Sequence, residues 1–187
     1  EFCLTTNLDP SDLDWAMERY NDDRNHEVMV ASAEVEYEGY CQLTRVEEIM
    51  TFARKIGARK IGIANCIGLI NEARIFAQIL RKNGFEPYAV ICKVGGKAKT
   101  SVGIPAACEG IGAAMCNPIL QARLLNEAHT DLNVVIGLCV GHDSLFYRYS
   151  EAYVTTLVTK DRVTGHNPAA ALYTARSYYK KKLHMDE

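Results

Sequence analysis

Short apolar runs alternate with helical segments from residue 60 onward, and this alternation constrains the fold more than any other feature of the chain. The apolar runs cover residues 60–64, 85–92, 132–138 and 153–159. A strand, a helix and a second strand in succession form a right-handed crossover, which makes the two strands parallel and lays the helix on a face of the sheet. The pattern therefore predicts an α/β fold: a three-layer, Rossmann-like, mostly parallel sheet of four or slightly more strands, with helices on both faces.

Helix signals flank these runs. Thr44 and Glu47 have the spacing of a capping box, which predicts a helix over 44–56. The segments 69–83 and 142–149 have helical spacing of their apolar residues. An asparagine N-cap followed by proline at the first helical position opens two further helices, at Asn117 and Asn167, which we expect to end near residues 128 and 182.

The N-terminal part of the chain, residues 8–40, is polar and helical in pattern. We expect a short helix that ends at residue 20, with Ser11 or Asp12 as its N-cap, and a second helix over 22–36. We expect one domain, 1–187, with a helical N-terminal segment over 1–40 and an α/β core over 41–187. The glycine-rich stretch 97–114 is long for a loop in a compact domain, which favours a functional loop such as a lid.

Composition excludes several classes of protein. A net charge of −2 without a basic block argues against nucleic-acid binding. No apolar run approaches the roughly 20 residues of a membrane helix, so no membrane partner is expected. The cysteines number seven, an odd count, and have no close pairs, which favours a reducing, cytoplasmic location over a disulfide framework.

Cysteine and histidine residues stand at the turns that follow the predicted strands. Because the carboxyl ends of parallel strands meet at one edge of a sheet, these turns are expected to lie together. Thiolate and imidazole suit zinc, copper or iron–sulfur centres, although no local CxxC or HExxH motif is present. We therefore predict a metal ion, such as zinc, or an iron–sulfur cluster. The predicted metal ligands are Cys66, Cys92, Cys116, Cys139, His142 and His166.

The same edge has the features of an anion site for a small-molecule ligand. Helix N-termini present backbone N–H groups there, basic side chains add charge, and glycines let the backbone approach a ligand. The predicted ligand-binding residues are Lys93, Gly95, Asn117, Gly141, Lys160, Asp161, Arg162 and Asn167.

Three other interpretations stay open. A cysteine at a helix N-terminus has a depressed pKa, which makes Cys66, Cys116 or Cys139 a possible nucleophile or redox thiol. The protein could then be a metal-independent enzyme or redox sensor acting on an anionic small molecule. The catalytic candidates are then Cys139, His142 as base and Asp143 as its orienter, although Asp143 also fits a plain N-cap. Free cysteine is often buried, so these residues could also serve packing alone.

Several of these residues belong to long runs that resemble a known family. The runs are MCNP (115–118), GLCVGHDSLF (137–146) and KDRVTGHNP (160–168), and the likeness extends over most of the chain from about residue 25. They resemble a family of uncharacterised prokaryotic proteins, a domain of unknown function thought to bind metal. The resemblance implies metal binding without naming a reaction.

Members of that family begin with an additional cysteine-rich segment, whereas only Cys3 stands near the start here. If that segment supplies ligands, part of the site lies outside this sequence. Cys41 could either pack in the core or ligate a metal. No ligand role is transferred from the family to Cys108. A tyrosine-rich end, with Tyr173 and Tyr178, fits either a homo-oligomer interface or a helix packed on the sheet.

Overall fold

The computed structural model describes residues 3–185, and contacts divide them into two compact units, up to Gly57 and from Ala58 onward. The sequence boundary at residue 40 differs from this division, since the helix after Tyr40 groups with the N-terminal helices. Lys55 on that helix pairs with Glu34 and Glu38, at 2.8 and 2.9 Å. The single domain expected from the sequence stays a prediction.

The N-terminal unit is helical, as its pattern predicts. It contains the 3₁₀ turn η1 (Leu4–Thr6) and the helices α1 (Pro10–Tyr20), α2 (Asp23–Gly39) and α3 (Arg45–Lys55). The N-cap expected at Ser11 or Asp12 is wrong. Asp9 occupies that position and accepts the Ser11 N–H, because Pro10 suits the first helical position.

The capping box of α3 is present: Thr44 accepts the Glu47 N–H, and the Glu47 carboxylate accepts the Thr44 N–H at 2.8 Å. We expect Thr44→Ala to destabilise the N-terminal unit by about 1 kcal/mol, because it removes one of these bonds. Thermal unfolding followed by circular dichroism would measure this. Glu47→Gln retains the reciprocal bond and should cost less; equal losses in the two variants would contradict the capping role.

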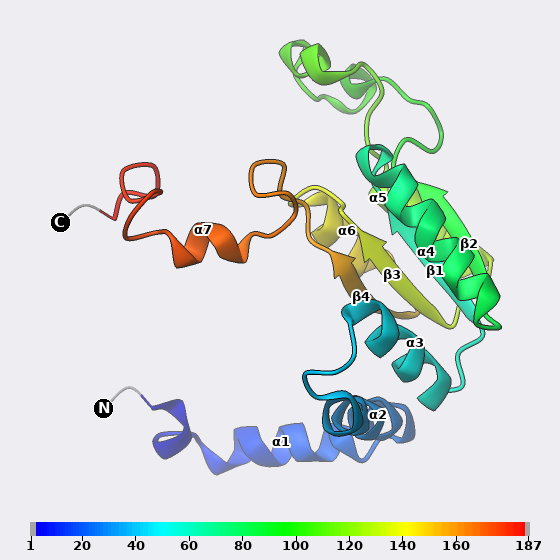
Figure 1. Cartoon of the computed structure of the whole chain (residues 1–187), viewed down its shortest axis with the longest axis vertical. Coiled ribbons are helices and arrows are strands. Elements are labelled where there is room, and N and C mark those ends of the chain that lie inside the picture. The colour runs from blue at the N-terminus through cyan, green and yellow to red at the C-terminus, as the bar shows by residue number, and fades with distance from the viewer. Residues whose placement is uncertain (1–2, 186–187) are drawn as a thin grey trace. The chain divides into compact units, whose positions relative to one another are not determined.

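The second unit is a four-stranded parallel sheet, which confirms the predicted α/β class. Its strands are β1 (Lys60–Asn65), β2 (Glu86–Ile91), β3 (Leu132–Ile136) and β4 (Tyr153–Val158). The spatial order is β2-β1-β3-β4, and every pairing is parallel (Figure 1). The central strands β1 and β3 are almost wholly buried, which agrees with their continuous apolar sequences.

The helices that connect the strands are α4 (Ile70–Lys82), α5 (Pro118–Glu127) and α6 (His142–Tyr149). From β1 the chain moves outward to β2 and then reverses direction to β3 and β4. Right-handed crossovers place α4 on one face and α5 with α6 on the other, and α5 and α6 contact each other. Because the direction reverses between β1 and β3, the carboxyl ends of these strands form a topological switch point.

The connection between β2 and α5 is more ordered than a loop. It contains η3 (Lys99–Val102) and η4 (Ala106–Ile111), and an isolated bridge between Ala98 and Ala114 closes its base. We call residues 97–114 the lobe. Lys99 is buried within it and donates to the Cys108 carbonyl at 2.5 Å.

The last helix differs from the prediction. It is α7 (Ala169–Tyr173), which ends well before residue 182, and the Asn167 side chain makes no capping bond because Pro168 holds the N-cap position. None of its residues is buried, and Leu172 and Tyr173 are 73% and 84% exposed. A helix depends on packing of an apolar face for most of its stability. Among the described residues, α7 has no such packed face. No described helix is long and apolar enough to cross a membrane.

Candidate functional site

The turns at the carboxyl edge of the sheet hold most of the residues singled out in the sequence. Cys66 follows β1 and opens the 3₁₀ turn η2 (Ile67–Leu69), Cys92 follows β2, and Cys139 lies three residues beyond β3. Cys116 lies between the lobe and α5. Parallel pairing therefore brings segments that are far apart in the sequence to one edge, as the sequence predicts.

Three of the thiols lie close together at this edge: Cys66 and Cys92 belong to one buried cluster, and Cys116 packs against it. Cys92 influences the pKa of both Cys66 and Cys116, and His142, on the first turn of α6, influences that of Cys116. We call Cys66, Cys92 and Cys116 the thiol cluster. Cys66 and Cys92 are buried and Cys116 is half-buried, so the cluster opens toward the surface at Cys116.

Backbone hydrogen bonds explain why these cysteines meet. Asn65 and Ile91 are the last paired residues of β1 and β2, so Cys66 and Cys92 are the next residues in register. The Cys92 N–H still donates to the Asn65 carbonyl at 2.9 Å. The Asn117 N–H donates to the Cys92 carbonyl at 2.7 Å, which holds the start of α5 and the adjacent Cys116 against the end of β2.

The turn after β1 also directs backbone donors at the sulfurs. The Ile67 N–H donates to Cys92 Sγ at 3.3 Å, and the Gly68 N–H donates to Cys66 Sγ at 3.4 Å. Hydrogen bonds of this kind favour the charged form of a thiol. The η2 turn therefore stabilises negative charge on the cluster without a metal.

The three thiols have very different proton affinities. Hydrogen bonding to Cys92, the Gly68 N–H and the Lys160 ammonium lower the pKa of Cys66 to about 5, against the effect of burial. Hydrogen bonds from Cys92 and His142, with the Lys93 charge, lower the pKa of Cys116 to about 4. The pKa of Cys92 is raised, because it lies between two thiolates and is buried. Cys92 is thus the thiol that keeps its proton.

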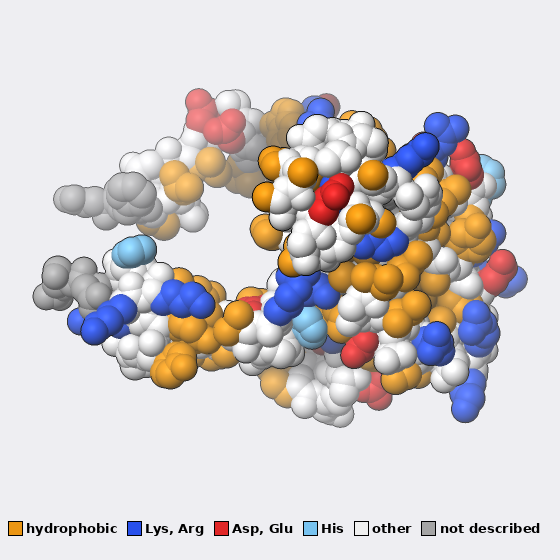
Figure 2. Space-filling model, turned by 90° about the horizontal axis from the view of Figure 1, so that it is seen from above, with side chains coloured by type: hydrophobic (Ala, Val, Ile, Leu, Met, Phe, Trp, Pro, Cys, Tyr) orange, Lys and Arg blue, Asp and Glu red, His pale blue; other side chains and the backbone are white. Residues whose placement is uncertain are grey.

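Basic groups surround this negative charge. The pKa of His142 is raised by its hydrogen bond to Cys116. Lys93 Nζ donates to the Ala114 carbonyl of the lobe, and Lys160 lies beside Cys66. The pKa of Arg162 is raised by its hydrogen bond to Cys139 and by the charges of Cys66 and Cys116. On the face seen in Figure 2, basic side chains, in blue, and a histidine, in pale blue, lie near one another.

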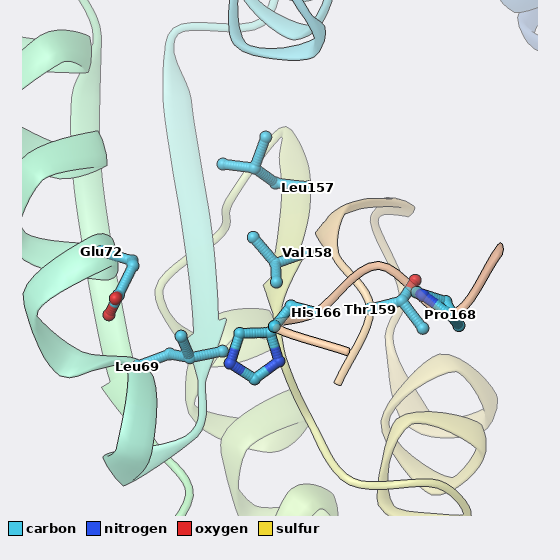
Figure 3. Close-up of a pocket in the computed structure, with 8 residues that line it drawn as sticks. Leu69, Glu72, Leu157, Val158, Thr159, His166 and Pro168 are labelled. Atoms are coloured by element: carbon cyan, nitrogen blue, oxygen red, sulfur yellow. The ribbon is translucent and has the colours of Figure 1, made fainter. Parts of the chain in front are cut away.

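Two predicted metal ligands have other partners. The Cys139 thiol accepts from Arg162 Nη2 at 3.1 Å and makes no described contact with the thiol cluster. His166 faces a separate pocket of about 510 Å³ beside Leu69 and Val158 (Figure 3). Its Nδ1 accepts the Asp161 N–H at 3.1 Å, and its backbone has a positive φ of 67°.

The role of Asp143 as an N-cap is wrong. Gly141 occupies that position with φ 84°, and the Asp143 carboxylate accepts the N–H groups of Gly141 and Ser144. Asp143 influences His142 through its charge, which helps to raise the pKa of His142. Among the described hydrogen bonds, none joins the Asp143 carboxylate to the His142 imidazole.

The predicted ligand-binding residues have mixed surroundings. Asn117 caps α5 by accepting the Leu120 N–H at 3.1 Å, as expected from the Asn-Pro pattern. The Asp161 carboxylate accepts the N–H groups of Val163 and Thr164, which lower its pKa and hold the loop after β4. Gly95 is exposed at a positive φ of 86°, as glycine readily allows.

The sequence interpretation missed Gly137, which shapes the exit of β3. Gly137 has φ 62°, and a Cβ there would overlap Cδ1 of Leu69 in the η2 turn. A side chain here would have to displace the buried Leu69 side chain and adopt a positive φ, so glycine is favoured between the exits of β1 and β3. A glycine directly after an apolar strand was the signal that could have identified this position.

No three Cys, His, Asp or Glu side chains form a ready metal-ligand group within residues 3–185. The thiol cluster supplies the sulfur donors that a soft metal prefers, but these side chains as they lie do not form a coordination sphere. The exposed Cys41 and Cys108 lie outside this cluster: Cys41 follows α2 and Cys108 is in the lobe.

Comparison with other proteins places the chain in a family without an assigned activity. The chain is 50% identical over 167 residues to the uncharacterized protein MJ0455 of Methanocaldococcus jannaschii, a match covering 89% of this chain and 85% of that protein. A family model described as a protein of unknown function, DUF1847, matches residues 3–157. The matched region includes the whole thiol cluster and His142. The chain therefore belongs to the DUF1847 family.

Proposed function

We propose that this protein binds a thiophilic metal ion such as zinc, or an iron–sulfur cluster, through Cys66, Cys92 and Cys116. The observation that supports this most is the packing of three thiols from separate turns against one buried cluster at the switch point of the sheet. Thiolates are the preferred ligands of zinc and iron–sulfur centres. His142, in contact with Cys116, is the nearest candidate for a fourth ligand.

The surrounding charges suit a thiolate complex. Three thiolates around a divalent ion carry a net negative charge, and an iron–sulfur cluster with cysteine ligands is also negative. Lys93, Lys160 and Arg162 would offset that charge. Cys92 would lose its proton on binding, because only the thiolate is a ligand. The metal would thus take the place of the Cys92 proton and hold the three sulfurs together.

Cys139 and His166 are further candidates within this proposal. Cys139 would have to exchange its Arg162 partner for the metal, and His166 would have to leave the Asp161 N–H. Neither change is needed if Cys66, Cys92, Cys116 and His142 complete the site. We place the protein in a reducing compartment such as the cytoplasm, where these thiols would stay available for metal.

Elemental analysis and absorption spectra of protein purified without oxygen would test the metal site. We expect stoichiometric zinc, or iron with sulfide and a visible charge-transfer band. In Cys92→Ser, which removes the central sulfur, the metal content should fall at least about tenfold. The matched control is Cys108→Ser, an exposed thiol of the lobe, which should keep full occupancy. Equal metal content in both variants, or a folded wild-type protein that takes up no added zinc or iron, would refute the proposal.

A metal-independent thiol enzyme or sensor is the second candidate. The observation that favours it is the half-buried Cys116, whose thiolate is stabilised beside His142 and Lys93. Such a thiolate could attack an anionic small molecule drawn by Lys93, Lys160 and Arg162. Full reactivity of Cys116 toward a thiol reagent in protein that neither contains nor takes up metal would favour this candidate over the first.

A further inference from the structure

We infer that Cys92 and Cys116 form a reversible disulfide that disables the metal site. The inference rests on the proposed function for what the disulfide regulates, while the disulfide itself is a property of this pair of thiols. Oxidation would remove two of the three sulfurs of the thiol cluster. A site that has lost two thiolates cannot keep a soft metal bound by cysteine.

The backbone already holds this pair close together. The hydrogen bond of 2.7 Å from the Asn117 N–H to the Cys92 carbonyl joins Cys92 to the residue that follows Cys116. The Cys116 side chain also packs against the buried cluster that contains Cys92. A disulfide needs Cα atoms about 4.4–6.8 Å apart and side chains directed at each other. The hydrogen bond from Asn117 to Cys92 brings the two backbones together, as this geometry requires.

The segment between the two cysteines can accept the bond. It consists mainly of the lobe, which has its own closure in the bridge from Ala98 to Ala114 and in the Met115 N–H donating to the Lys97 carbonyl at 2.8 Å. A disulfide between Cys92 and Cys116 would close the same loop at a point just outside that bridge. It would leave β2 and α5 in place.

Accessibility selects Cys116 over Cys66 as the first thiol to react. Cys66 and Cys92 are only 6% and 2% exposed, whereas Cys116 is half-buried at the open side of the cluster. Cys66 is also held by the Gly68 N–H and by Lys160. A small oxidant therefore reaches Cys116, and the buried Cys92 is the neighbour that completes the reaction.

The oxidant is a low-molecular-weight disulfide, R–S–S–R, of the oxidised-glutathione type. The Cys116 thiolate attacks one sulfur, forming a mixed disulfide and releasing RS⁻. Cys92 then gives up its proton and attacks the Cys116 sulfur, and the second RS⁻ leaves and takes up that proton. The two protein sulfurs lose two electrons and the Cys92 proton. The small disulfide gains the two electrons and leaves as two RS⁻ groups, one protonated by the Cys92 proton and the other by solvent. A dithiol reductant reverses the reaction.

The test uses the full chain, freed of metal with a chelator and treated with oxidised glutathione. We expect the number of titratable thiols to fall by two and the protein mass to fall by two hydrogen atoms. Tryptic digestion without reduction should join the peptide 83–93 to the peptide 100–123. Because the second peptide also contains Cys108, the digest is carried out on a Cys108→Ser background.

Variants separate the possible pairings. Cys66→Ser should still form the disulfide, and Cys92→Ser should stop at a mixed disulfide of Cys116 with glutathione. Loss of the disulfide in Cys66→Ser, with the peptide 61–74 joined to 83–93 in wild type, would overturn the assignment. Absence of any intramolecular disulfide in the folded protein would overturn it as well.

The regulatory part has its own readout. Cadmium added before the oxidant should slow disulfide formation at least about tenfold, because a bound metal occupies the same sulfurs. If cadmium is bound but the disulfide forms at the same rate, the inference that oxidation controls metal binding would be overturned. Failure of cadmium to bind at all would instead count against the proposed function, with the disulfide still measured in its absence.

Discussion

Replacing Gly62 with alanine should destabilise the α/β unit by about 3–5 kcal/mol, a large part of the stability of an ordinary domain. Gly62 lies in the middle of β1, and a Cβ there would overlap Oδ1 of Asn133 on β3. Asn133 is fully buried, accepts from Thr130 Oγ1 at 2.8 Å and donates to Ser150 Oγ at 2.9 Å. The alanine would therefore overpack the core and break a buried hydrogen bond.

Chemical denaturation of Gly62→Ala would measure this loss as a lower midpoint. Gly110→Ala is the matched control, since no atom lies within 4 Å of a Cβ at that position, and it should change the stability by less than about 1 kcal/mol. Adding Asn133→Ala to Gly62→Ala should recover part of the loss, because it removes the overlapping amide. A double variant whose loss equals the sum of the two single losses would contradict the steric explanation.

Alkylation of Cys116 in the metal-free protein should be nearly independent of pH between about 6 and 8. Its pKa is lowered from the usual 9.0 to about 4 by the hydrogen bonds from Cys92 and His142 and by the Lys93 charge. Cys116 is therefore already a thiolate at pH 6. A thiol with an ordinary pKa loses about tenfold in thiolate, and so in rate, for each unit below that pKa.

Iodoacetamide labelling at several pH values, followed by peptide mass analysis, would measure the rate at Cys116. The same chain unfolded in urea supplies the reference with a tenfold slope. His142→Gln removes a cation and should move the point at which the rate begins to fall to a higher pH. A tenfold fall per pH unit for Cys116 in the folded wild type would contradict the lowered pKa.

The positions of β1, β2, β3 and β4 were predictable to within about two residues, because a continuous apolar run between helical segments is a strong local signal. The lengths of the terminal elements were not. The Asn-Pro pattern was the same at Asn117 and Asn167, yet only Asn117 caps its helix. The difference lies in tertiary packing, since α5 buries a face against the sheet and α7 buries none.

The edge on which the site forms was determined by the sequence alone, because successive crossovers make the strands parallel and parallel strands end on one side. Which residues meet there was decided by tertiary structure. Cys66 and Cys92 follow paired strands, whereas Cys116 joins them through the hydrogen bond between Asn117 and Cys92. Cys139 pairs instead with Arg162 and His166 faces another pocket. Side-chain direction after a strand depends on the backbone angles of the turn and on its long-range hydrogen bonds. The spacing of the cysteines in the sequence specifies neither of these.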